Sequence, residues 1–168
     1  MPGAEVPVPL SKVREFLDNN NIKYLVISHS LAYTAQGIAA LTHIPGKELA
    51  KTVVVAIDGR LAMAVVPASS RVDLFKLKNY LSAEVVELAD EEQFRGQFPD
   101  CETGAMPPFG NLYGMEVFAD QSLMQDKEIA FNAGSHRELV RMNFDDYRQL
   151  VTPVILPLAA GKFAVHAA

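Results

Sequence analysis

The residue whose chemistry stands out first is Lys51. It ends a short polar run from Pro45 and precedes the apolar run 53–57, which reads as a buried strand. A lysine at the mouth of such a strand must reach water, meet an acidic partner or line a cavity. On a cavity wall its ammonium group would attract an anion or a carbonyl oxygen without changing protonation. The alternatives are an ordinary solvated lysine and an ion pair with Glu48, three residues earlier.

A second candidate is the loop 103–111. Gly104 and Gly110 bracket Met106 and the pair Pro107-Pro108, so stiff backbone lies between two permissive positions. Glycine allows the main chain to approach a ligand closely, and exposed N–H groups there would bind an oxyanion. The alternative is a plain rigid turn that leads into the next strand.

The third candidate is the segment 131–136, which ends in Gly134, Ser135 and His136. A serine beside a histidine invites a nucleophile–base interpretation. Adjacent residues on a tight turn rarely face each other, however, and the sequence shows no third, orienting acid. We therefore expect the turn to present main-chain groups to a ligand, with His136 lining the site or lying on the surface.

The sequence lacks the residue patterns that several other common chemistries require. No two histidines have a metal-binding spacing, and there is neither a Walker loop nor a GxGxxG motif, so we expect no metal and no cofactor. Cys101 lies between Asp100 and Glu102, whose charges disfavour a thiolate. We expect it to be a poor nucleophile.

The composition limits which classes of protein the chain can belong to. The chain has 168 residues, 49% hydrophobic and 21% charged, and a single cysteine that cannot form an intrachain disulfide. These values predict one globular domain in a reducing, cytoplasmic setting. We find neither a signal peptide nor an apolar run of the roughly 18 residues that a membrane helix needs. A net charge of −5 means that nucleic acid must be contacted through a local patch or a chain end.

The elements that must position these candidates alternate between helices and strands. Helices are expected after Ser11, after Thr34 as an N-cap, over 72–81, after Asp90 and over 144–151. Strands are expected over 23–28, 52–57, 61–66, 84–88, 112–119, 128–133 and 139–142, with a hairpin at Asp58-Gly59.

This order favours an α+β fold with a mixed, largely antiparallel sheet surrounded by helices. We expect one domain over 1–156. The residues 157–168 are expected to form a C-terminal tail, either a frayed end or the start of a linker.

Four short motifs, taken together and in order, indicate a protein family. They are Tyr33-Thr34, Lys51-Thr52 before a valine-rich strand, the run from Gly104 to Gly110, and Ala133-Gly134-Ser135-His136-Arg137. In this order they resemble the YbaK / prolyl-tRNA synthetase-associated editing domain family, over nearly the whole chain. Members are typically aminoacyl-tRNA deacylases, which hydrolyse the ester between a wrong amino acid and the tRNA 3′ end. Their fold is a curved, mixed sheet with helices around it.

The resemblance implies roles for individual residues. Lys51 would be the central site lysine, and main-chain groups of the Gly104 and Gly134 loops would hold the ester or the terminal adenosine. A water or the free ribose hydroxyl would attack, so that no protein nucleophile is needed. Lys51 and Gly134 are thus the expected catalytic positions. The expected substrate contacts are Tyr33, Thr34, Thr52, Gly104, Met106, Pro107, Pro108, Gly110, Ser135 and His136.

The chain departs from the family at two positions. Pro107 stands where many relatives carry serine or threonine, and His136 stands where many carry a basic residue. The preferred hypothesis is a trans-editing deacylase that acts on the aminoacylated 3′ end of tRNA, with neither DNA nor a membrane as partner and with no oligomeric state implied. Two alternatives stay open. One is a non-catalytic module that binds an amino-acid-like ligand or a tRNA end, or regulates an attached domain. The other is an unrelated hydrolase built on Ser135 and His136.

Overall fold

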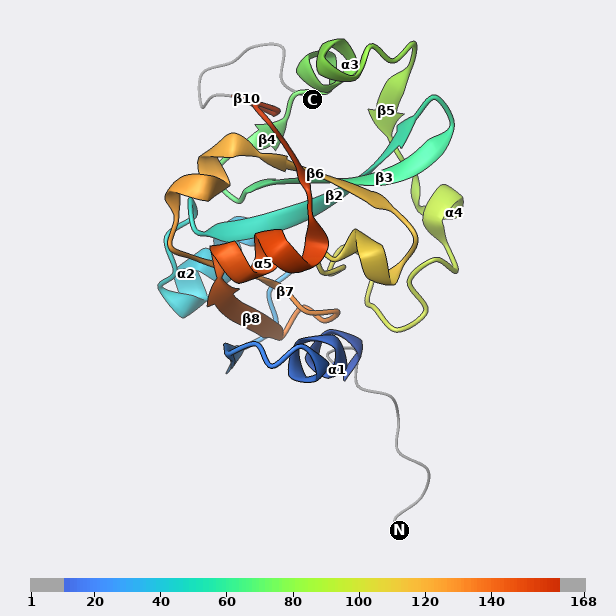
Figure 1. Ribbon diagram of the computed structural model, residues 1–168. Coiled ribbons are helices and arrows are strands. Elements are labelled where there is room, and N and C mark those ends of the chain that lie inside the picture. The colour runs from blue at the N-terminus through green and yellow to red at the C-terminus, as the bar shows by residue number, and fades with distance from the viewer. Residues whose placement is uncertain (1–10, 161–168) are drawn as a thin grey trace.

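The computed structural model describes residues 11–160, which fold around one eight-stranded sheet (Figure 1). Its strand order is β1-β8-β7-β2-β3-β6-β9, and β5 pairs with β2 outside this path. The strands are β1 (Tyr24–Ser28), β2 (Leu49–Ile57), β3 (Arg60–Pro67), β5 (Val86–Leu88), β6 (Glu116–Asp120), β7 (Glu128–Asn132), β8 (Glu138–Asn143) and β9 (Val154–Leu156). A separate pair joins β4 (Arg71–Val72) to β10 (Ala159–Ala160).

The sheet is mixed but mostly antiparallel, as the sequence predicted. The strand pairs β2–β7, β3–β6 and β6–β9 are parallel, and the remaining pairs are antiparallel. The hairpin β2–β3 turns at Asp58 and Gly59, whose φ angles are 48° and 83°. Both values suit an Asp-Gly turn whose twist matches that of the strands. The predicted α+β class is confirmed.

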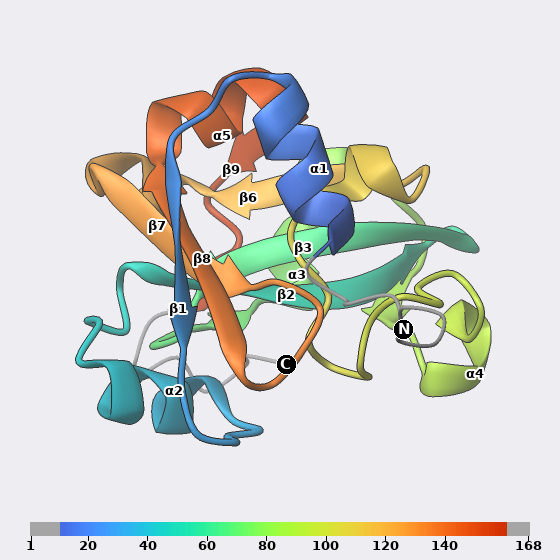
Figure 2. The same ribbon diagram turned by 90° about the horizontal axis from the view of Figure 1, so that it is seen from below.

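Helices cover both faces of the sheet (Figure 2). The main core joins one face to α1 (Ser11–Asn19) and α5 (Phe144–Val151). On the other face, one cluster lies under α3 (Leu74–Leu81) and a second lies under α2 (Ala35–Thr42). The short α4 (Glu91–Phe94) precedes the proline-containing loop. None of the helices within 11–160 is long and apolar enough to cross a membrane.

Helix starts follow the capping residues that the sequence offers. Thr34 caps α2, with its Oγ1 accepting a hydrogen bond from the Gly37 N–H at 3.0 Å. Asp90 caps α4 and Asn143 caps α5, both as predicted. Asp73 caps α3, so that helix begins two residues later than expected. Short polar side chains at these positions satisfy N–H groups that have no partner within the helix.

Several predicted boundaries are wrong, among them the start of β2, which lies at Leu49 and not at Thr52, so that Lys51 is inside the strand. The strand expected over 112–119 begins only at Glu116, because Gly110–Leu112 forms a short 3-10 helix (η1) and the chain then turns at Gly114. The tail expected from Pro157 is ordered as far as Ala160. Leu158 is fully buried, and its N–H donates to the buried Asp120 carboxylate at 3.0 Å. The remaining tail, 161–168, and the proline-rich start, 1–10, lie outside the described residues.

Gly110 is required by close packing. A Cβ at this position would meet the Met115 carbonyl oxygen and would lie 2.6 Å from Val117 Cγ2. Gly110→Ala should therefore lower the free energy of unfolding by about 1–3 kcal/mol, the usual cost of overpacking. Gly46→Ala is the matched control, because a Cβ there would reach Ser69 Cβ only at 3.4 Å. Thermal or urea unfolding of both variants measures the difference, and equal stabilities would contradict the packing argument.

Candidate active site

Lys51 lies on the sheet face that α2 and α3 cover. Side chains alternate along a strand, so Lys51 shares its face with Leu49 and Val53. Leu49 belongs to the cluster under α2, and Val53 packs against the cluster under α3. Lys51 therefore occupies the seam between two apolar clusters, and its side chain is half-buried.

Asn132 is the neighbour of Lys51 on the adjacent strand. The parallel pair β2–β7 matches Leu49 with Ala130 and Ala50 with Phe131, so the next residues, Lys51 and Asn132, point to the same face. The Asn132 Oδ1 atom is buried and has no hydrogen-bond partner within 11–160. Asn132 lies in the segment 131–136 that the sequence indicated, but its place beside Lys51 follows only from the pairing of two distant strands.

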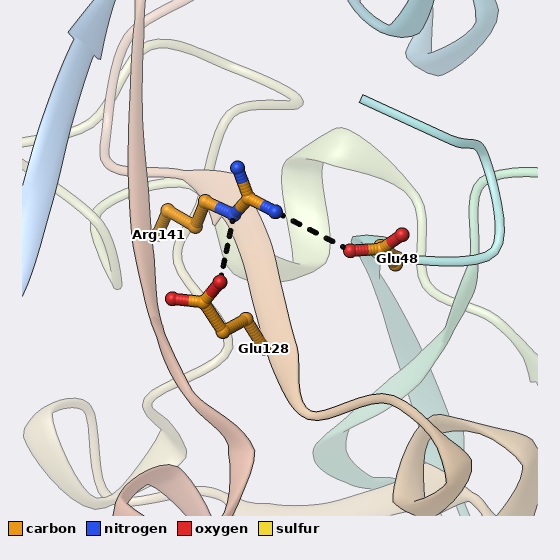
Figure 3. Close-up of polar contacts among 3 residues, drawn as sticks. All are labelled: Glu48, Glu128 and Arg141. Carbon is orange, nitrogen blue, oxygen red and sulfur yellow. Dashed lines mark hydrogen bonds and ion pairs between the residues drawn. The ribbon is translucent and has the colours of Figure 1, made fainter. Parts of the chain in front are cut away.

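Glu48 is not the partner of Lys51. Its carboxylate lies 3.5 Å from the Arg141 guanidinium, which also lies 3.5 Å from Glu128 (Figure 3). The three salt bridges of the described residues leave Lys51 out. The sequence allowed an ion pair between Glu48 and Lys51, but in the structure Glu48 pairs with Arg141 of β8 instead.

The environment of Lys51 disfavours its charge. Burial is the larger cause, and the positive charge of Arg71 is the second; both lower the pKa of the Lys51 ammonium group. A half-buried cation beside a like charge gains most from an anionic or electron-rich ligand.

The two glycine-containing loops are hydrogen-bonded to each other. The Glu102 N–H donates to the Gly134 carbonyl oxygen at 2.7 Å, and the Gly134 N–H donates to the Ala105 carbonyl oxygen at 2.9 Å. Gly104 and Gly134 have φ angles of 85° and 104°, which other residues rarely adopt. Because its N–H is already used, Gly134 contributes its conformation and not a free donor.

His136 closes the junction of the loops. The ring is buried, and its Nε2 lies 2.8 Å from the Thr103 carbonyl oxygen, which can only accept a hydrogen bond. Nε2 therefore carries the proton, and in the neutral ring Nδ1 is an acceptor. Nδ1 is buried without a partner in the described part of the chain. The exposed Tyr33 ring packs against the imidazole, with centroids 4.8 Å apart and the ring planes tilted by 55°.

Ser135 does not form a nucleophile–base pair with His136. Its hydroxyl donates to Glu138 Oε1 at 3.1 Å and accepts from the Arg137 N–H at 3.2 Å. His136 is held elsewhere by Thr103 and Glu102. The hydrolase alternative built on these two residues is therefore wrong, and Ser135 is part of the turn.

Comparison with known proteins identifies the family of the chain. The model of the aminoacyl-tRNA editing domain matches residues 29–150, most of the chain. The chain belongs to the aminoacyl-tRNA editing domain family.

Its relatives carry this domain within longer proteins. Proline--tRNA ligase of Bacillus subtilis (strain 168) is 30% identical over 138 residues, which cover 81% of this chain but 22% of the ligase. Proline--tRNA ligase of Bacillus mycoides (strain KBAB4) is 30% identical over 86 residues, 51% of this chain and 15% of the ligase. The chain thus spans less than a quarter of these relatives.

Solved structures share the fold of the editing domain at low identity. A protein provisionally assigned as a trans-editing enzyme for prolyl tRNA synthetase superposes with a TM-score of 0.78 and 20% identity, covering 94% of this chain and 100% of that one. Hypothetical protein APE2540 gives a TM-score of 0.79 and 18% identity, covering 89% and 99%.

The proline-containing loop of this editing domain is mostly buried. Met106, Pro107, Pro108 and Gly110 are all covered by the rest of the chain. The Pro108 carbonyl oxygen accepts a 2.7 Å hydrogen bond from the hydroxyl of the fully buried Tyr147. The residues 106–110 therefore anchor the loop in the main core, and the open part of the loop is Glu102 to Gly104.

The remaining predicted contacts divide between the two faces. Thr34 is exposed at the start of α2, near the junction because the Ala32 N–H donates to the His136 carbonyl oxygen at 3.3 Å. Thr52 alternates with Lys51, so its side chain points to the main core, where Oγ1 has no partner among the described residues. Thr34 and Tyr33 remain predicted substrate contacts. The Thr52 side chain lies on the opposite face of the sheet from Lys51, so it points away from a ligand bound beside Lys51.

Cys101 is unsuited to nucleophilic chemistry in this domain. Burial raises the pKa of its thiol to about 11, and the sulfur lies 3.3 Å from the Tyr113 hydroxyl. It lines a cavity of about 160 Å³ on the α4 side of the loop, together with Phe94, Phe98 and Met106. Lys51 does not line this cavity.

Ser135→Ala should keep most of the editing activity. The substitution removes one hydrogen bond to Glu138 and one from the Arg137 N–H, which costs about 1–2 kcal/mol of stability but removes no reacting group. Thermal unfolding and deacylation of mischarged tRNA are measured on the same preparation. A loss of activity to background in a folded variant would restore the nucleophile interpretation.

Proposed function

We propose that this protein hydrolyses the ester bond of mischarged tRNA and acts in trans on a charged tRNA that is released from its synthetase. The observation that supports the proposal is the position of Lys51. It is a half-buried cation that forms no ion pair within 11–160, and it lies on the face of β2 where Asn132 and the loop junction follow along β7. Membership of the editing family supplies the class of reaction.

The proposed role of Lys51 is electrostatic. When the nucleophile adds to the ester carbonyl, negative charge develops on the carbonyl oxygen. An ammonium group that is already held in place and partly desolvated stabilises this charge more than a solvated group would. The cost of burying the cation is met during folding and not during the reaction.

The loop junction would hold the reacting group against that cation. A water attacks the carbonyl carbon and loses a proton, the ester C–O bond breaks, and the ribose oxygen takes up a proton. Attack by the free hydroxyl of the terminal ribose would only move the acyl group to that hydroxyl, so a water must complete the hydrolysis. The products are the free amino acid and the uncharged tRNA. No protein nucleophile takes part.

The proposed substrate is a tRNA for proline that carries a smaller or similar amino acid. The support is that the matched relatives are proline--tRNA ligases and that a structural neighbour is assigned to prolyl tRNA synthetase. To identify the amino acid that is removed, hydrolysis is measured on tRNA charged with alanine, serine, cysteine or proline. Pockets that rely on size discriminate one methylene by roughly 10–200-fold, so one ester of this set should be clearly preferred.

Lys51→Ala should reduce deacylation to background while the fold survives, because the side chain ends in no salt bridge and fills little of the core. Lys127→Ala is the matched control. Lys127 is exposed and precedes β7, at the end of that strand remote from Asn132. Release of radiolabelled amino acid measures activity, and circular dichroism confirms folding. Full turnover by Lys51→Ala would contradict the mechanism.

A second function has one observation in its favour. The same fold, with a TM-score of 0.71, covers 31% of a longer protein that is provisionally assigned to signal transduction. If no charged tRNA of the set is hydrolysed but a tRNA end still binds, this domain is a binding module and the deacylase proposal is wrong.

A further inference from the structure

The chain segment from β3 to β4 carries a second cation to the neighbourhood of Lys51. Lys51 pairs with Val66 across the β2–β3 hairpin, and the chain then turns at Pro67, where the carbonyl oxygen accepts from the Ser70 N–H at 2.9 Å. Arg71 follows directly. Its backbone is fixed because Arg71 pairs with Ala160 in the β4–β10 ladder.

Arg71 has no assigned role and no carboxylate partner. Its side chain is exposed, and it takes part in none of the salt bridges that the structure shows within 11–160. The nearest acidic residue along the chain, Asp73, is buried and uses its carboxylate to cap α3, accepting from the Lys76 N–H at 3.0 Å. Lys51 and Arg71 thus bring two positive charges close together in a chain with a net charge of −5, and neither forms a salt bridge within 11–160.

We propose that Arg71 binds the phosphate of the terminal adenosine while Lys51 acts on the ester of the same nucleotide. This inference rests on the proposed function and deepens it, because it makes Arg71 a positioning residue. The aminoacyl ester lies on the ribose, and the 5′ phosphate lies at the other end of that ribose, so one nucleotide offers both groups. Guanidinium binds phosphate through two parallel hydrogen bonds, which fixes orientation as well as position.

The electrostatics of the free protein agree with this arrangement. Arg71 is close enough to Lys51 to contribute to the lowered pKa of the lysine, after the larger effect of burial. A phosphate beside Arg71 would neutralise that repulsion and would favour the charged form of Lys51. Binding of the correct nucleotide would thereby also prepare the group that stabilises the reaction.

The experiment compares two substrates in the wild-type protein and three variants. One substrate is the preferred aminoacyl-tRNA, and the other is the matching 3′-aminoacyl-adenosine, which has the same ester but no phosphate. Arg71→Gln removes the charge, and Arg71→Lys restores it without the guanidinium fork. Arg60→Gln is the matched control, because Arg60 lies at the opposite end of β3 and pairs with Glu116 at 2.9 Å.

For Arg71→Gln we expect kcat/KM to fall on the order of tenfold on the tRNA, mainly through KM, with no change on the adenosine ester. Arg71→Lys should recover part of the loss, and Arg60→Gln should match the wild type on both substrates. The slope of log kcat/KM against log salt should become shallower by about 0.7 in Arg71→Gln, the value for one phosphate contact on a single strand. Equal losses on both substrates, or no loss on the tRNA, would overturn the inference.

A competition experiment on the wild-type protein does not depend on a folded variant. Adenosine 5′-monophosphate should inhibit deacylation more strongly than adenosine, and the two should inhibit Arg71→Gln equally. Equal inhibition of the wild type would overturn the phosphate contact while leaving the deacylase function intact. If the wild type hydrolyses no charged tRNA at all, the proposed function fails and the inference fails with it.

Discussion

The structure of the site depends on the hydrogen bonds that join two loops distant in sequence. Gly134 accepts from the Glu102 N–H at 2.7 Å and donates to the Ala105 carbonyl oxygen at 2.9 Å, and His136 donates to Thr103 at 2.8 Å. These bonds form only because both glycines adopt positive φ angles. Without them the open residues Glu102 to Gly104 would lose their contacts with the Gly134 turn, and the buried imidazole would lose the acceptor that defines its tautomer.

The second feature is a cation held where it has no partner. Proteins usually pair half-buried charges. Here the nearby acid in the sequence, Glu48, pairs with Arg141 on β8 and not with Lys51. The result is a half-buried cation that forms no salt bridge within 11–160, and under the proposed function the substrate supplies its counter-charge. Such an arrangement costs stability in the free protein and is typical of functional sites, where unfavourable groups are maintained by the surrounding fold.

Local sequence signals predicted most of the elements, because strand periodicity, the Asp58-Gly59 turn and the helix caps are short-range properties. They placed Lys51 before a strand, whereas it lies inside β2, which begins at Leu49. The parallel pairing of β2 with β7 is non-local, and with it came Asn132 as a neighbour of Lys51 and Arg141 as the partner of Glu48. The two short strands β4 and β10 carry too few residues to show periodicity, so the order of the chain as far as Ala160 was missed.

The burial of the proline-containing loop could not be predicted from its composition. Two glycines around two prolines indicated a loop with accessible main chain, but they did not show that Tyr147 would hold Pro108 from the core. The deciding contact comes from a helix 39 residues away in the chain. The serine–histidine pair failed for a related reason: the hydroxyl finds Glu138 three residues on, a partner that the turn geometry selects.

Under the proposed function, the Lys51 ammonium group and the joined loops face one bound nucleotide. The most direct measurement is a crystal structure of the protein with a non-hydrolysable amide analogue of 3′-aminoacyl-adenosine. The geometry predicts that the amide carbonyl oxygen lies within hydrogen-bond distance of Lys51 Nζ and that the aminoacyl group contacts His136 and the main chain near Gly104. An analogue bound elsewhere, or bound here with Lys51 pointing away into solvent, would contradict the claim.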